Sequence, residues 1–313
     1  LYTVPYFYQH NVVVEELTGC GCQYCPYGWQ GMENLRETFG DRFIGIALHQ
    51  YDGTVAKDAM NLPTKNYAQL EFNGAPYVRI ERGPELHAYY GSGYSICEDF
   101  GEVLKNNAYA EAEVTATWNA DKTAVNMTAS VETMMENKPL QMEFVLVADG
   151  LTGEIGFKQV NAFASFAAKN YPEDLQKFCK GVEFGKNPIK LTYNDVAIAS
   201  SYKESVNALP PLGVLTPFTR VEQSLTIEMP TYAKLVQAIK DANYDVWAVA
   251  IIIDAETQLI MNATKVKVVE DPTGIKAVDA DTRSEAVYNI AGQRLVQPQK
   301  GINIRGGKKF VVR

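Results

Sequence analysis

Long apolar runs are missing from this 313-residue sequence, and the longest candidate, from Val246 to Asp254, has the length of a strand. A membrane-spanning helix needs about 20 consecutive apolar residues, so we expect none here. A basic excess is missing as well, because 37 Asp and Glu outnumber 29 Lys and Arg and give a net charge of −8. Phosphate backbones are bound by clustered Lys and Arg, so we expect no nucleic-acid partner.

Histidine and cysteine are scarce, with three and five residues. The histidines show no spacing typical of a catalytic triad. Three cysteines lie within six residues, which in a chain of this length is not the disulfide framework of a small secreted domain. The odd total leaves at least one thiol unpaired. We expect Cys97 and Cys179 to be buried free thiols, with a disulfide between them as the alternative.

The chain is organised around residues 12–28, which read Val-Val-Val-Glu-Glu-Leu-Thr-Gly-Cys-Gly-Cys-Gln-Tyr-Cys-Pro-Tyr-Gly. The apolar run at 12–14 predicts a buried strand. Apolar residues at a spacing of three to four predict a helix from Pro26 to Phe39. The nearly continuous apolar stretch 43–49 predicts a second strand that is buried on both faces. Strand, helix and strand together predict a βαβ unit.

Cys22 and Cys25 lie where the first strand passes into the helix. A thiol attacks disulfides as its thiolate, and the free N–H groups of a helix start favour that anion. We therefore expect a lowered pKa for Cys22, with Cys25 placed to resolve a mixed disulfide. Two alternatives stay open. The pair could be a static structural disulfide, or Cys20, Cys22 and Cys25 could bind zinc or copper(I) with His10 or His49.

The rest of the chain changes character after residue 109. Ser95 and Glu98 form a predicted capping box for a helix that ends near Asn106. Beyond it, residues 114–131 predict a β-hairpin, and the mostly strand-like pattern predicts an antiparallel β-sandwich with helical insertions. We expect partly helical structure at 52–70, a helical stretch at 161–181 that is broken at Pro172, a helix at 232–242, a linker at 271–274, and short strands in a basic tail. The predicted domains are 1–109, 110–274 and 275–313.

Residues 15–19 and 22–28 resemble the opening of the thioredoxin-like domain in Omp28-related outer-membrane proteins of Bacteroidetes. Gly74-Ala75-Pro76 resembles the cis-proline turn that faces the Cys pair in thioredoxin folds. Residues 287–294 and 300–309 resemble C-terminal modules of exported Bacteroidetes proteins. The sequence departs from thioredoxins at Gly21, where they carry Trp, and in the additional Cys20.

The resemblance implies an α/β thioredoxin-like domain followed by the β-sandwich and an all-β tail. It implies Cys22 as nucleophile, Cys25 as resolving cysteine, Glu16 as buried proton acceptor and Pro76 as part of the substrate face. We assign substrate contacts to Tyr24, Ala75 and Tyr77.

These features predict an extracytoplasmic protein, in the periplasm, at the outer membrane or on the cell surface, that carries out thiol–disulfide exchange. Its partners would be protein thiols and disulfides or surface ligands, and we expect no cofactor and no metal. Any membrane association would depend on an N-terminal anchor that these residues do not contain. The alternative is a cell-surface binding or adhesion protein that uses the thioredoxin-like domain as a non-catalytic scaffold.

Overall fold

The computed structural model describes residues 7–68, 70–89, 95–230, 235, 244–270, 287–289, 294–295, 297–305 and 308–312. Residues 1–270 form one compact unit and residues 271–313 form a second. Among the described residues, no helix combines the length and the apolar character needed to cross a membrane.

The predicted strand–helix–strand unit is confirmed. β1 (Val12–Thr18) leads into α1 (Pro26–Phe39), and β2 (Phe43–His49) returns parallel to β1 with Val12 opposite Phe43. Because β2 is buried along its whole length, its apolar run covers both faces of the sheet.

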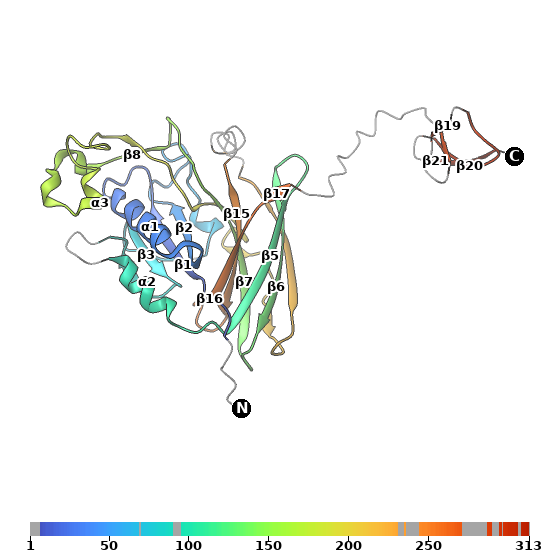
Figure 1. Cartoon of the computed structure of the whole chain (residues 1–313), viewed down its shortest axis with the longest axis horizontal. Coiled ribbons are helices and arrows are strands. Elements are labelled where there is room, and N and C mark those ends of the chain that lie inside the picture. The colour runs from blue at the N-terminus through green and yellow to red at the C-terminus, as the bar shows by residue number, and fades with distance from the viewer. Residues whose placement is uncertain are drawn as a thin grey trace. The chain divides into compact units, whose positions relative to one another are not determined.

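Two antiparallel strands and a helix complete the first part of the chain, which comprises the described residues up to 109. β3 (Tyr77–Ile80) pairs with the free side of β1, and β4 (Glu85–His87) pairs with β3. α2 (Ile96–Leu104) packs beside α1 over one face of these strands (Figure 1). As predicted, the Ser95 hydroxyl caps α2 by accepting a hydrogen bond of 3.2 Å from the Cys97 amide.

The same sheet continues into the second part of the chain. β10 (Val196–Ser200) lies parallel to β2 with Val196 opposite Ala47, and the strand order is β16-β15-β7-β10-β2-β1-β3-β4. The predicted boundary between residues 109 and 110 therefore falls inside the first compact unit, and the division into three domains stays a prediction. The remaining strands are β7 (Pro139–Ala148), β15 (Val246–Asp254), β16 (Ile260–Lys267) and β13 (Gly213–Val214), which pairs with β7.

A second sheet, of order β14-β6-β5-β17, packs against β15 and β16 (Figure 1). β5 and β6 pair antiparallel with Trp118 opposite Val125, which confirms the predicted hairpin. Alternate residues of β7 explain the layering, because Met142 and Phe144 face the core shared by the two sheets, whereas Val145 faces a separate core. The strands of this sheet are β5 (Ala110–Trp118), β6 (Ala124–Thr133), β14 (Val221–Glu228) and β17 (Val269–Glu270).

The helical stretch expected over residues 161–181, broken at Pro172, is confirmed only in part. The segment forms short pieces instead, η3 (Ala162–Ser165), η4 (Ala168–Asn170) and α3 (Glu173–Gln176). The buried Asn161 amide donates to the carbonyls of Phe178, Phe184 and Lys186 at 2.9, 3.0 and 3.2 Å. This side chain gathers the segment into loops, in competition with a continuous helix.

The other helix predictions meet a mixed outcome. Residues 52–70 contain, among those described, one turn of 3₁₀ helix, η2 (Thr64–Asn66). The expected helix at 232–242, apart from Leu235, and the linker at 271–274 lie outside the described residues.

Short elements complete the two units. In the first unit they are η1 (Gly40–Arg42), the pair β8 (Lys158–Gln159) and β9 (Ile189–Lys190), and the pair β11 (Tyr202–Lys203) and β12 (Val206–Asn207). The second unit has a four-stranded sheet of order β19-β18-β20-β21. Its strands are β18 (Val287–Asn289), β19 (Arg294–Leu295), β20 (Gly301–Arg305) and β21 (Lys308–Val312).

A buried arginine joins β1 to β7. Arg82, which follows β3, donates to Glu15 of β1 at 3.2 Å and to Glu143 of β7 at 3.0 Å. The two carboxylates are at most 1% exposed. Hydroxyl groups of Tyr67 and Tyr202 donate to Glu15 and Glu143 respectively. One cation and two hydroxyls thus compensate two buried carboxylates, which an apolar environment would otherwise disfavour.

We predict that Arg82→Met lowers the free energy of unfolding by about 3–5 kcal/mol, because it leaves two carboxylates buried without a cation. Urea unfolding monitored by tryptophan fluorescence measures the loss. Arg220→Met is the matched control. Arg220 contacts Glu111 on the surface with 37% of its side chain exposed, so its loss should cost no more than about 1 kcal/mol. Equal losses in the two variants would contradict the role assigned to Arg82.

Candidate functional site

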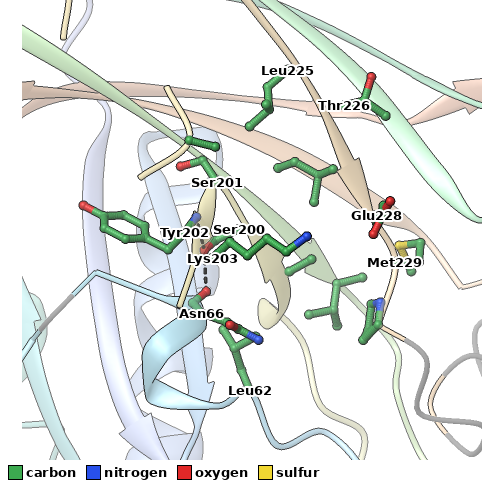
Figure 2. A pocket seen from close by; sticks show the side chains of 15 residues that line it. Leu62, Asn66, Ser200, Ser201, Tyr202, Lys203, Leu225, Thr226, Glu228 and Met229 are labelled. Carbon is green, nitrogen blue, oxygen red and sulfur yellow. Dashed lines mark hydrogen bonds between the residues drawn. The ribbon is translucent and has the colours of Figure 1, made fainter. Parts of the chain in front are cut away.

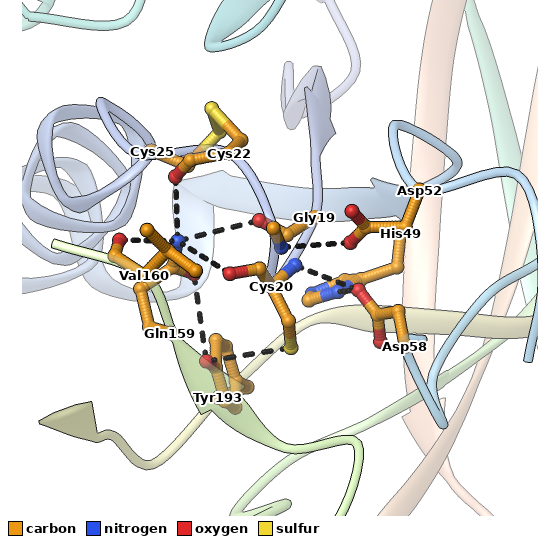
Figure 3. Close-up of a disulfide and its surroundings, with 11 residues drawn as sticks. Gly19, Cys20, Cys22, Cys25, His49, Asp52, Asp58, Gln159, Val160 and Tyr193 are labelled. Carbon is orange, nitrogen blue, oxygen red and sulfur yellow. Dashed lines mark hydrogen bonds and ion pairs between the residues drawn. A yellow bond between two sulfur atoms is a disulfide. The ribbon is translucent and has the colours of Figure 1, made fainter. Parts of the chain in front are cut away.

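Cys22 and Cys25 form a disulfide in the loop between β1 and α1, with their Cα atoms 5.3 Å apart (Figure 3). Cys25 is the N-cap residue of α1, and Pro26 follows at the first helical position, where a missing N–H costs nothing. Cys22 lies one turn earlier, and its amide donates to the Gly19 carbonyl at 3.1 Å. The helix start, which favours a thiolate, is therefore closest in sequence to Cys25. The lowered pKa expected for Cys22 stays a prediction.

Both bonded cysteines are buried. Cys22 is 3% exposed and Cys25 is 1% exposed, whereas Tyr24 between them is 44% exposed. The Tyr24 ring stands edge-on to Phe163, with the ring centroids 6.1 Å apart. Gly21, Gln23 and Tyr24 are exposed in this loop, whereas the two bonded cysteines are not.

Glu16 lies directly beneath the first turn of α1. A Cβ atom placed on Gly28 would lie 1.8 Å from Glu16 Oε1, so α1 approaches this carboxyl group only because residue 28 is glycine. The side chain is buried, and its Oε1 atom has no hydrogen-bond partner among the described residues. Burial raises the pKa of Glu16 from its ordinary value of 4.5 to about 8, with a hydrogen bond from Thr18 opposing the shift. Burial therefore favours the protonated form of Glu16.

The Ala75–Pro76 peptide bond is cis. Pro76 lies against the same turn of α1, because a Cβ atom on Gly28 would be 2.7 Å from Pro76 Cβ. No hydrogen bond from another described residue engages the backbone of Ala75. Tyr77 is half-buried and packs against His87, with the ring centroids 4.4 Å apart. The structure thus brings Glu16, Gly28 and Pro76 together beside the disulfide loop.

The residue before Cys22 has a steric reason to be glycine. The Gly21 amide donates to Asp52 Oδ2 at 2.8 Å, and a Cβ atom here would lie 2.0 Å from Asp52 Oδ1. Asp52 therefore occupies the space that a larger side chain would need. Asp52 belongs to the loop after β2, so that loop lies beside the disulfide loop.

Gln159 is a residue of this site that the sequence did not reveal. It lies in β8, and its side-chain amide donates to the Cys22 carbonyl at 2.7 Å and to the carbonyls of Gly19 and Cys20 at 3.3 Å (Figure 3). Backbone amides of Val160 and Ala162 donate to the carbonyls of Cys20 and Gln23 at 2.8 and 3.0 Å. A segment more than 130 residues later thus holds the disulfide loop, and a glutamine at that separation gives no signal in the sequence.

A buried polar cluster lies behind the loop. Asp58 Oδ2 accepts a hydrogen bond of 2.8 Å from the Cys20 amide and lies 2.8 Å from His49 Nδ1. Burial opposes the ionisation of Asp58, but the positive charge and hydrogen bond of His49 outweigh it and hold the pKa of Asp58 below its usual range. The Cys20 thiol is free, and burial raises its pKa. Cys20 is therefore a poor nucleophile.

The metal site considered from the sequence does not form in this state. Cys22 and Cys25 are bonded to each other, and His10 lies elsewhere, 2.7 Å from Glu81. Ligand atoms of Cys20, His49 and Asp58 lie within 4.8 Å of one another. Asp58 is already engaged by His49 and by two backbone amides, so hydrogen bonding explains the cluster.

The two remaining cysteines are free, which removes the expected alternative of a disulfide between them. Cys179 is buried, as predicted, whereas Cys97 is half-buried near the start of α2.

A separate groove lies between β10 and β14 (Figure 2). Its volume is about 460 Å³, and Ser200 in its wall donates to the Asn66 carbonyl at 2.5 Å. Lys203 and Glu228 bring one charge of each sign to the lining. None of the site residues predicted from the sequence lines this groove.

Comparisons with known proteins show similarity of fold. No family model and no curated protein matches the sequence. Among solved structures, HBP35 of Porphyromonas gingivalis matches with a TM-score of 0.52 and 14% identity, over 97% of this chain and 98% of that one. A protein of Agrobacterium tumefaciens matches with a TM-score of 0.45 and 11% identity, over 86% of this chain and 98% of that one.

We predict that Gln159→Leu speeds the reduction of the Cys22–Cys25 disulfide by dithiothreitol several-fold. The isosteric apolar side chain removes the donor for three carbonyls of the loop, which should then open more often. Thiol labelling and mass spectrometry after timed quenching measure the rate. Gln258→Leu, which removes an exposed amide bonded to the Ala255 carbonyl, is the control. An unchanged rate in Gln159→Leu would show that the amide does not hold the loop.

We also predict a pH-dependent gain in stability for Glu16→Gln. Between about pH 4.5 and 8 the unfolded chain ionises Glu16 while the folded chain keeps it protonated. Raising the pH therefore costs the native protein roughly 1.4 kcal/mol per pH unit in that window, which the variant does not lose. Urea unfolding of both proteins at pH 5, 6, 7 and 8 measures the difference. A difference that stays constant across these pH values would show that the pKa of Glu16 is not raised.

Proposed function

We propose that this protein carries out thiol–disulfide exchange through Cys22 and Cys25, and that residues 1–109 are a thioredoxin-like redox module. A Cys-x-x-Cys pair beside a βαβ unit is the context in which that motif supports a redox function. The order β2-β1-β3-β4, with β1 and β2 parallel and Cys25 as the N-cap residue of α1, supplies this context.

The chemistry starts from the oxidised pair. A substrate thiolate attacks Cys22 Sγ, the Cys22–Cys25 bond breaks, and Cys25 leaves with the electron pair. Glu16, protonated at neutral pH, gives its proton to the Cys25 thiolate. A second substrate thiolate then attacks the substrate sulfur of the mixed disulfide and releases Cys22. The substrate loses two electrons and forms a disulfide, and the protein gains two electrons, with Cys25 as a thiol and Cys22 as a thiolate. The reverse sequence reduces a substrate disulfide.

The observation that carries this proposal is the buried carboxyl group of Glu16, whose Oε1 atom has no hydrogen-bond partner among the described residues. A carboxyl group with a raised pKa, buried beneath the Cys25 end of α1 and beside Pro76, costs folding free energy. A disulfide that serves only as a crosslink needs no proton donor. A disulfide whose leaving cysteine must be protonated does need one. Among the described residues none hydrogen-bonds the backbone of Ala75, which supports the proposal further, because an extended peptide could pair with it.

We propose an extracytoplasmic location, in the periplasm, at the outer membrane or on the cell surface, in the manner of the Omp28-related proteins that the sequence resembles. The similarity of fold to HBP35, a Bacteroidetes protein, over nearly the whole of both chains supports this placement. The partners would then be protein thiols and disulfides of those compartments, where disulfides persist.

The second candidate is a surface-binding or adhesion protein in which the Cys pair is a structural crosslink. The specific observation in its favour is burial, since only 3% of Cys22 is exposed and its carbonyl is held by Gln159. Structural disulfides resist reduction, with potentials below about −300 mV. The reduction potential of the pair therefore separates the two candidates.

We predict that the wild-type protein catalyses the reduction of insulin by dithiothreitol and that Cys22→Ser abolishes this activity, because the attacked sulfur is gone. Cys97→Ser is the matched control. It removes a free half-buried thiol near the start of α2 and should leave the rate unchanged.

Equal rates in wild type and Cys22→Ser would exclude exchange through this pair. A potential below about −300 mV, measured against glutathione and dithiothreitol, would then favour the structural crosslink.

A further inference from the structure

A small polar cavity lies between α1 and the sheet. Its volume is about 20 Å³, and its lining includes Glu16 from β1, His49 from β2, and Gln159 and Tyr193 from the second part of the chain. A cavity needs roughly 10–15 Å³ of volume open to the centre of a water molecule, together with two to four polar partners, to hold one water. The cavity therefore fits one water and is too small for an organic ligand.

Two buried polar atoms without a described hydrogen-bond partner belong to residues that line this cavity. They are Glu16 Oε1 and His49 Nε2. Glu16 is 2% exposed and His49 is 1% exposed, so bulk solvent does not satisfy either atom. A buried polar atom left without a partner costs about 1–3 kcal/mol. One water held by both atoms would remove that cost at both ends.

The orientation of His49 is set from the opposite side. Its Nδ1 atom lies 2.8 Å from Asp58 Oδ2, which itself accepts from the Cys20 amide (Figure 3). The ionised Asp58 fixes the Nδ1 hydrogen, so Nε2 accepts a hydrogen bond when the ring is neutral and donates one when it is charged. A histidine oriented by a carboxylate is the arrangement that proton transfer uses.

We propose that a buried water links Glu16 to His49, so that the Asp58–His49 pair supplies the proton that Glu16 passes to Cys25. This deepens the proposed function and rests on it. The cavity excludes bulk solvent, so Glu16 needs an internal route to recover its proton. His49 is a positioning residue in this scheme, because it acts on sulfur only through Glu16.

The proton balance closes within the cluster. When a substrate thiolate attacks Cys22, Cys25 leaves as a thiolate and takes the proton of Glu16. The Glu16 carboxylate takes a proton from the water, and the water takes one from His49 Nε2. In this scheme His49 starts as the charged ring and ends neutral, Asp58 stays ionised, and the net charge stays at the one negative charge that arrived with the thiolate. Reoxidation of the pair runs the same steps backward.

Other ionisable groups surround this route and are shared by the variants compared below. Glu33 and Arg36 of α1 line the cavity, Arg36 is paired with Asp195, and Tyr193 stacks edge-on to His49 with centroids 5.3 Å apart. The further groups in the surroundings are Cys20 and Asp52 from the loops on either side.

Two substitutions of His49 distinguish the effect of losing the water from the effect of losing the imidazole charge. His49→Asn keeps an amide nitrogen near Nδ1 that can donate to Asp58, and it has no atom in place of Nε2. His49→Gln keeps a polar atom near Nε2 instead. Both remove the imidazole charge from Asp58, so any electrostatic effect of that loss is common to the two. His10→Gln is the control, because His10 is another buried histidine beside a carboxylate, Glu81, 2.7 Å away.

The readout is the pKa of Glu16 itself, followed by infrared difference spectroscopy through the carbonyl band of its protonated form. Glu16→Gln assigns the band. We expect the pKa of Glu16 to rise by about one pH unit more in His49→Asn than in His49→Gln, because an anchored water solvates the carboxylate in the latter. His10→Gln should match wild type. The pH profile of disulfide reduction should move with the infrared pKa.

Equal infrared pKa values in His49→Asn and His49→Gln would overturn the water link. A stoichiometric metal ion in the purified protein, lost in His49→Asn, would overturn it as well. The same measurements distinguish failure of the water link from failure of the proposed function. A protein without exchange activity whose Glu16 pKa still separates the two variants keeps the water link and loses the redox role. An active protein with equal pKa values keeps the redox role and loses the link.

Discussion

Within the first compact unit, the joining of residues 7–109 to residues 110–270 depends on the ion pairs of the Arg82 guanidinium. The guanidinium lies between Glu15 of β1 and Glu143 of β7 and compensates both carboxylates in a buried environment. The strands between them, β2 and β10, meet through one pair of residues, so the ion cluster reinforces a narrow seam. Because Glu15 is fixed in this way, the register of β1 is fixed too. Its neighbour Glu16 must then face the opposite side, under α1.

This alternation gives two adjacent glutamates opposite environments. Glu15 has a cation and a hydroxyl and contributes to the joint, whereas Glu16 has a carboxyl oxygen without a described partner and a raised pKa. The same joint brings the second part of the chain against the disulfide loop. Gln159 and the backbone of 160–162 hold the loop from a distance of more than 130 residues. The disulfide is therefore embedded between both parts of the chain instead of lying at an open surface.

The sequence predicts those helices and strands that a local pattern of residues determines. Apolar periodicity located β1, α1 and β2, Ser95 marked the start of α2, and alternation marked the β5–β6 hairpin. The resemblance to thioredoxins also grouped Glu16 of the first strand and Pro76 with Cys22 and Cys25. The sequence failed where tertiary contacts decide. Apolar spacing suggested a helix at 161–181, yet the Asn161 amide collects three carbonyls and holds the segment as loops. Gln159 and Asp58 join the site through packing, which no local pattern encodes.

The burial of the Cys pair suits a structural crosslink, whereas the burial of Glu16 suits a redox role. The free-energy cost of each burial decides which observation weighs more. Burial of a disulfide costs little, since sulfur is weakly polar, so the low exposure of Cys22 is compatible with a crosslink and with a gated redox pair. Burial of a charged carboxyl group would cost several kcal/mol, so the group raises its pKa and keeps its proton instead. A chain that needed only a crosslink would gain stability by replacing Glu16 with an apolar residue. Local rules of folding are broken most often where function requires it. The carboxyl group beneath α1 is therefore a stronger indicator of activity than the disulfide above it.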